Sequence, residues 1–276
     1  MIKTLNLISM KDNRFGRYTT AAIVIGGIIG TYFFSRPGRN KIKTKLDNKR
    51  QKKVDQNLLT PANATFGIVW STVYIGTIAL AVHQALPSQS DNTRYKKAQP
   101  WLRLNYILTG LFGYFFSKSN KTNRIGAAIT TISMLPAAIG LHRALEIGQT
   151  EVVEPENTLR KFVSLYTGWL TAASTISVTT LIQESGYFKK PDEAKQWTLS
   201  ALPIISAVGT VVSKRLNDPY YLITLIAALA GIAVKQKDSQ KEISALAASL
   251  AVLLVGEFGN QLGLGKHLDF INVKGI

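Results

Sequence analysis

Hydrophobic residues along the chain are gathered into long runs that short polar connections separate. Stretches free of Asp, Glu, Lys and Arg cover residues 18–35, 56–90, 104–117, 125–142, 162–183, 196–213, 219–234 and 243–256. Each contains a segment rich in aliphatic residues, glycine and aromatics. As a helix, about 20 apolar residues cross the roughly 30 Å hydrocarbon core of a bilayer. The pattern therefore predicts an all-α, polytopic membrane helix bundle.

The expected membrane spans, with uncertain ends, are residues 18–35, 64–86, 101–117, 125–145, 160–183, 198–213, 219–235 and 242–257. Shorter spans remain feasible because flanking Lys and Arg side chains reach the interface. The pattern leaves open whether the last run, 243–256, crosses the bilayer fully or only dips into it. Residues 1–17 and 259–276 are expected to form terminal tails, and no soluble domain fits between the spans.

The large net positive charge does not change the prediction of a membrane helix bundle. The 276 residues include 33 Lys+Arg and 16 Asp+Glu, which gives a formal charge of +17. Such an excess ordinarily favours nucleic acid as a partner. Here 46% of residues are hydrophobic, only 18% are charged, and the charges lie in the connections. We therefore expect no nucleic-acid binding.

One polybasic block dominates the positive charge. Residues 36–53 hold nine Lys/Arg and one Asp. Cytoplasmic loops of membrane proteins carry an excess of Lys and Arg, so this block predicts a loop on the cytoplasmic side or the corresponding side of an organelle. A sharper alternative is contact with anionic lipid headgroups, which contributes about 1 kcal/mol per basic residue near the surface.

The motifs of common enzymes are absent from the sequence. There is no G-x-S-x-G, no phosphate-binding loop, no dinucleotide fingerprint and no pair of carboxylates within a span. The absence of cysteine removes thiolate catalysis, disulfides and Cys-based metal sites. We expect no enzymatic activity, no catalytic residues and no protein-built metal site. His83, His142 and Glu257 are expected at the membrane interface. The alternatives are haem ligation by His83 or His142 and helix pairing by Glu257.

Glycines in the first run offer a second structural hypothesis. Gly26 and Gly30 form a G-x-x-x-G pattern that lets another helix approach closely. The alternative is that both glycines face lipid.

Three blocks of sequence carry a family resemblance. Residues 59–87 contain Pro61 followed by Phe66, Trp70 and Tyr74, and residues at this spacing of four share one helix face. Residues 162–182 contain Tyr166 and Trp169 followed by a stretch rich in threonine and small residues. Residues 217–236 follow as a further apolar block. This order resembles the TspO/MBR family, the tryptophan-rich sensory proteins related to the mitochondrial translocator protein, in a longer branch with extra C-terminal helices.

The resemblance implies a five-helix core over residues 18–183 and about three additional helices over 184–258. It implies a site between helices, closed by the first loop, for a hydrophobic or amphipathic small molecule. Tetrapyrroles, such as porphyrin or haem, and sterols are the implied ligand classes, and no bound cofactor is certain. The implied lining consists of Phe66, Trp70, Tyr74, Tyr166 and Trp169.

The chain also departs from the family pattern. Thr109, Phe112 and Phe116 stand where an Asn and Trp residues are usual, and Ser177 replaces an Asn eight residues after Trp169. Thr109, Phe112 and Ser177 are therefore expected in the lining of a less polar pocket. Phenylalanine keeps the apolar area of tryptophan but lacks its N–H donor.

These departures favour an alternative function. The chain is then a non-catalytic accessory or structural subunit of a larger membrane complex, mitochondrial or plastid, with a degenerate pocket. Under either hypothesis we expect an integral membrane protein of a bacterial inner membrane or an organelle such as the mitochondrion. Besides lipid and ligand, the expected partners are further copies of this chain in a homo-oligomer or the subunits of the larger complex.

Overall fold

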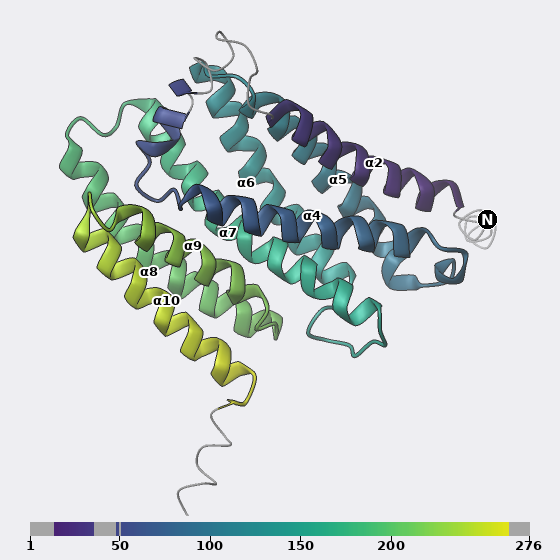
Figure 1. Ribbon diagram of the computed structural model, residues 1–276. Helices are drawn as coiled ribbons and strands as arrows, with labels where there is room; N and C mark the ends of the chain where they lie inside the picture. The colour runs from purple at the N-terminus through teal and green to yellow at the C-terminus, as the bar shows by residue number, and fades with distance from the viewer. Residues whose placement is uncertain (1–13, 36–47, 50, 265–276) are drawn as a thin grey trace, which may run out of the picture.

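The computed structural model describes residues 14–35, 48–49 and 51–264 (Figure 1). Over these residues the chain is helical and has no strand. The polybasic block 36–53 lies mostly outside the described residues, as do most of the tail 1–17 and residues 265–276.

The main helices are α2 (Arg14–Ser35), α4 (Asn63–Ala85), α5 (Thr93–Phe116), α6 (Lys121–Ala144), α7 (Glu156–Ser185), α8 (Pro191–Leu216), α9 (Tyr221–Gln236) and α10 (Lys241–Gln261). A short 3₁₀ helix, η1 (Pro87–Gln89), follows α4. Each predicted run overlaps one of these helices, so the predicted all-α bundle is confirmed. Several helices extend beyond the charge-free runs because charged residues occupy their end turns, as Glu156 does in α7.

Four of these helices, α4, α6, α8 and α10, are long and apolar enough to cross a membrane, by length and composition. Helix α9 is apolar but has only 16 residues. Large apolar side chains remain exposed on the outside of the bundle, for example Ile68 at 68% and Val252 at 71%. In water such surfaces are costly, whereas in a bilayer they face lipid. The chain is therefore a membrane protein with a helix-bundle fold.

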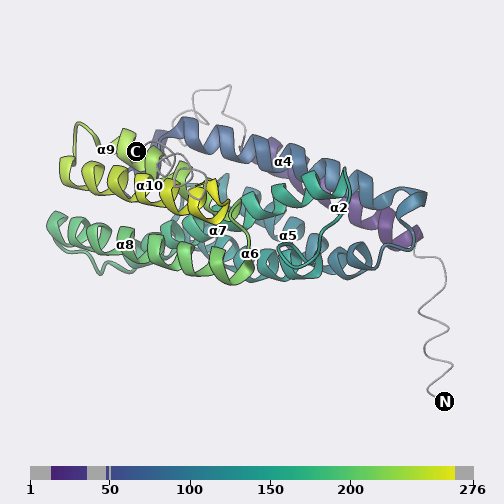
Figure 2. The same cartoon turned by 90° about the horizontal axis from the view of Figure 1, so that it is seen from below.

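Helix α7 joins two groups of helices. Figures 1 and 2 show α2, α4, α5 and α6 on one side of α7, and α8, α9 and α10 together on the other. Two hydrophobic clusters meet along α7, and both also contain residues of α4 and α6. Val163, early in α7, packs in the cluster of α2 and α5, whereas Trp169 packs in the cluster that contains α8, α9 and α10 residues. The 30 residues of α7 thus serve both cores.

Glycines set the closest helix contacts. A Cβ at Gly27 would overlap the backbone carbonyl oxygen of Tyr106, so α2 and α5 touch there backbone to backbone. A Cβ at Gly168 would overlap the carbonyl oxygen of Tyr221, at the contact of α7 with α9. Gly26 would have nothing within 4 Å, and Gly30 only the ring of Phe34 at 4.0 Å. The lipid-facing alternative therefore holds for the G-x-x-x-G pattern.

Polar side-chain contacts link the C-terminal helices to α6 and to one another. His142 Nε2 of α6 lies 2.8 Å from the carboxylate of Asp218 in the α8–α9 turn, and both side chains are buried. The expectation that His142 faces headgroups is therefore wrong, because Asp218 provides its polar partner inside the protein. Glu257 of α10 pairs with Lys214 of α8 at 3.2 Å, which is the helix-pairing alternative.

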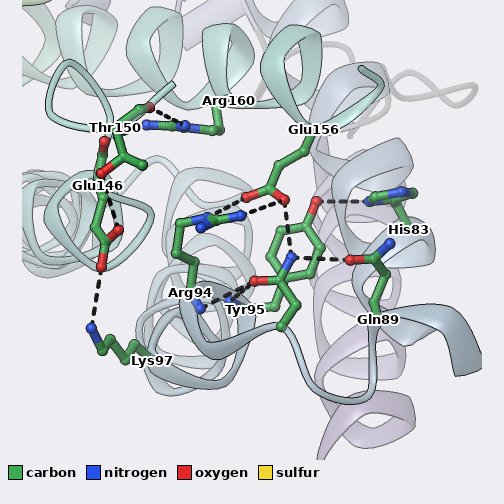
Figure 3. A network of polar contacts seen from close by, with 10 residues as sticks. His83, Gln89, Arg94, Tyr95, Lys97, Glu146, Thr150, Glu156 and Arg160 are labelled. Carbon is green, nitrogen blue, oxygen red and sulfur yellow. Dashed lines mark hydrogen bonds and ion pairs between the residues drawn. The ribbon is translucent and has the colours of Figure 1, made fainter. Parts of the chain in front are cut away.

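A polar network fixes the loops at one end of the bundle (Figure 3). Glu156 accepts hydrogen bonds from Arg94 Nε at 2.7 Å and from Asn92 Nδ2 at 2.9 Å. Arg160 donates to the backbone carbonyls of Thr150 and Glu146. The start of α7 is thereby tied to the start of α5 and to the loop that follows α6.

Candidate functional site

Aromatic rings from α4 and α7 meet between these helices. Phe66, Trp70 and Tyr74 lie on one face of α4, and Tyr166 and Trp169 lie on α7. We call these five residues the aromatic cluster. Ring centroids are 5.4 Å apart for Phe66 and Trp169, 6.1 Å for Trp70 and Trp169, and 6.3 Å for Trp70 and Tyr166. Trp70 and Tyr74 are 5.0 Å apart. These distances are those of favourable aromatic pairs.

The cluster has a buried side and an accessible side. Trp169 is 0% exposed and Tyr166 is 1% exposed. Phe66, Trp70 and Tyr74 are half-buried. The α7 rings are therefore covered more completely than the α4 rings.

The indole N–H of Trp169 is an unsatisfied donor. Nε1 of Trp169 is buried and has no hydrogen-bond partner among the described residues. Indole nitrogen is a donor only, and a buried donor without a partner costs about 1–3 kcal/mol. Native structures rarely leave such a group unpaired without a functional or structural reason. The cluster therefore presents an apolar surface with one donor that lacks an acceptor.

The other three predicted lining residues have different surroundings. Thr109 is buried, and its hydroxyl donates to the carbonyl of Asn105 in its own helix at 2.9 Å. Phe112 stacks on Phe116 at 5.1 Å and packs at the edge of the same hydrophobic cluster as Trp70. Ser177 is buried eight residues after Trp169, about 12 Å further along the helix axis. The structure therefore groups the five aromatic residues with Thr109, whose side chain interacts with that of Tyr166. Phe112 lies nearby and Ser177 lies apart.

Two residues beside the cluster were missed from the sequence. The hydroxyl of Tyr166 donates to Asn105 Oδ1 at 3.3 Å, and Tyr106 stacks on Tyr166 at 6.1 Å. Asn105 is fully buried. It precedes Thr109 by one helical turn, so it lies on the same face of α5. The spacing of Asn105 and Thr109 is the sequence signal that could have identified Asn105. A buried amide thus lies one helical turn before Thr109, the position at which the sequence indicates a lost Asn.

The rings of the cluster pack against one another. A cavity of about 20 Å³ lies between α7, α8 and α9 and is lined mostly by apolar residues, among them Ala172, Ile176, Leu202 and Leu225. It has room for about one water molecule. None of the five residues of the aromatic cluster lines this cavity, so it is separate from the cluster.

Metal chemistry finds no support in the described part of the chain. No group of three or more His, Asp or Glu side chains is placed to hold a metal ion there.

Comparison with known proteins gives one match. The model of a family described as TSPO-like protein matches residues 18–258. No curated protein and no solved structure matches the chain.

Proposed function

This chain belongs to the TSPO-like protein family, and we propose on that basis that it binds a hydrophobic or amphipathic small molecule at the aromatic cluster. The ligand classes are tetrapyrroles, such as protoporphyrin or haem, and sterols. The protein acts as a binding protein, and the proposed site needs no catalytic group.

The observation that carries this proposal is the unpaired indole N–H of Trp169. It lies among rings that offer a large apolar surface, and its partner rings on α4 are half-buried. A flat macrocycle with a peripheral carboxylate, or a sterol with a hydroxyl, supplies the apolar face and the acceptor together. Aromatic contacts with the ligand then replace the contacts that the rings make with one another.

Titration of the purified full chain in detergent tests the proposal. Protoporphyrin, haem and a labelled sterol are added separately, and bound ligand is followed by its own absorbance or fluorescence. We expect saturable binding of at least one ligand, and at least tenfold weaker binding by the Trp70→Ala, Trp169→Ala double variant. The matched control is Trp197→Ala, whose indole lies in α8 and bonds Thr179 at 2.9 Å. Absence of saturable binding for all three ligands refutes the proposal.

A second candidate function rests on the closed packing of the cluster. Trp169 is 0% exposed, and its ring packs directly against those of Phe66 and Trp70, as in a site that has lost its ligand. The chain is then an accessory subunit of a larger membrane complex. Extraction in mild detergent followed by native electrophoresis separates the two functions. Comigration with a large assembly supports the subunit function, and migration as a monomer or small homo-oligomer contradicts it.

A further inference from the structure

A groove separate from the aromatic cluster runs along the outside of the bundle between α4 and α9. Its walls are Ala64, Thr65 and Ile68 of α4 and Ala227, Ala230 and Val234 of α9, and its volume is about 290 Å³. Small residues keep it open, and the side chains of Ala64, Ile68, Ala230 and Val234 are exposed. In a membrane protein such a surface faces the lipid. The groove therefore offers an apolar channel to a molecule within the bilayer.

One end of the groove is polar and positively charged. Asn63 directly precedes Ala64, and Lys235 directly follows Val234. Lys235 donates to Asp55 at 2.7 Å, and Gln51 reaches both Asp55 at 3.1 Å and Asn63 at 3.5 Å. The turn that contains Gln51 and Asp55 also carries Lys52 and Lys53, and both are exposed. Lys235 therefore pairs with Asp55, and Lys52 and Lys53 lie three and two residues before Asp55 in the same short segment.

The start of α4 adds to the positive potential. Its N-cap residue is Ala62, which provides no side-chain hydrogen bond to the first turn, and that turn has no acidic residue. The free N–H groups of a first turn and the helix dipole both favour an anion.

We propose that the α4–α9 groove binds the acyl chain of an anionic phospholipid whose phosphate lies against Lys52, Lys53 and Lys235. An ammonium has three donors, so Lys235 retains capacity for a phosphate beside Asp55. The basic end favours an anionic lipid over an uncharged apolar helix, because a phosphate can pair with the ammonium groups there. This site does not depend on the aromatic cluster, so the two proposals fail or succeed separately.

Native mass spectrometry of the full chain, with phosphatidylglycerol or phosphatidylcholine added, tests the site. We expect one tightly bound phosphatidylglycerol per chain, with phosphatidylcholine bound more weakly. The Lys52→Gln, Lys53→Gln, Lys235→Gln variant should lose about fivefold in affinity for phosphatidylglycerol per charge removed. Its affinity for phosphatidylcholine should stay unchanged. The matched charge control is Lys96→Gln, Lys97→Gln, Arg143→Gln, because these three residues are exposed at the opposite end of the bundle.

A second variant tests the groove itself. Ala64→Leu, Ala230→Leu fills it from both walls, and binding of both lipids at this site should fall at least tenfold. The control is Ala245→Leu, Ala248→Leu on the exposed face of α10, which should bind as the wild type does. Circular dichroism verifies that each variant is folded. Equal binding of the two lipids by the wild type, unchanged binding by the groove variant, or a dimer that the groove variant dissociates would each overturn the proposal.

Discussion

Glu156 is the residue on which the polar network of Figure 3 converges. Burial raises the pKa of its carboxyl, but hydrogen bonds from Arg94 and Asn92 outweigh burial, so the pKa lies below its ordinary value. A lowered pKa in the folded state stabilises the fold above the unfolded pKa of about 4.3. That stabilisation is lost as the pH falls through the folded value.

The Glu156→Gln variant should therefore be less stable at neutral pH by about 1–3 kcal/mol, because Arg94 loses its charged partner. Its thermal stability in detergent should also fall less steeply between pH 5 and pH 3 than that of the wild type. The exposed Glu151 gives the control, since Glu151→Gln removes a carboxylate outside the network. An acid profile of Glu156→Gln that matches the wild type would contradict this role.

At the scale of single residues, spacing predicted the α4 half of the candidate site. Phe66, Trp70 and Tyr74 recur every four residues, and helix geometry alone puts them on one face. The partnership of Tyr166 with Asn105 joins residues 61 positions apart. Such a contact depends on how α5 and α7 pack, which periodicity does not encode. The missing acceptor of Trp169 is likewise visible only once every neighbour has been placed.

Among the helices, the contact of α2 with α5 depends on Gly27. Gly27→Ala should destabilise the protein by about 1–3 kcal/mol, because the added methyl would overlap the backbone of Tyr106 and force the helices apart. Gly26→Ala is the matched control. It has open space around the added methyl and gains helix propensity, so its stability should be unchanged or higher. Thermal unfolding in detergent measures both, and equal effects would contradict the account of this contact.

The existence of each helix was predictable, while helix ends and helix partners were not. Long apolar runs mark the helices because a bilayer requires them, but the charged end turns of α7 and α8 fall outside any such run. Whether Gly27 or Gly26 forms the close contact with α5 depends on which face of α2 is covered by α5. Similarly, His142 and Asp218 are 76 positions apart. Their pairing follows from the position of the α8–α9 turn against α6.

For the whole molecule, the uneven basic charge predicts orientation. The end that contains Lys235 and Lys237 also carries Lys52 and Lys53, the last residues of the polybasic block 36–53, and should face the cytoplasm. The chain has no cysteine, so single cysteines report topology without background. In intact bacterial cells that express the protein, an impermeant maleimide should label Ser88→Cys directly and Asp238→Cys only after permeabilisation. The reverse pattern would contradict the predicted orientation.

The central claim is that the indole N–H of Trp169 donates a hydrogen bond to an acceptor on the bound ligand. The most direct test is the affinity of Trp169→Phe for protoporphyrin, measured by porphyrin absorbance beside the wild type and Trp197→Phe. Phenylalanine keeps an aromatic ring and removes the donor. One hydrogen bond contributes about 0.5–1.5 kcal/mol, so Trp169→Phe should bind roughly 2–12-fold more weakly, while Trp197→Phe binds as the wild type does. Equal affinity of all three proteins would contradict the claim.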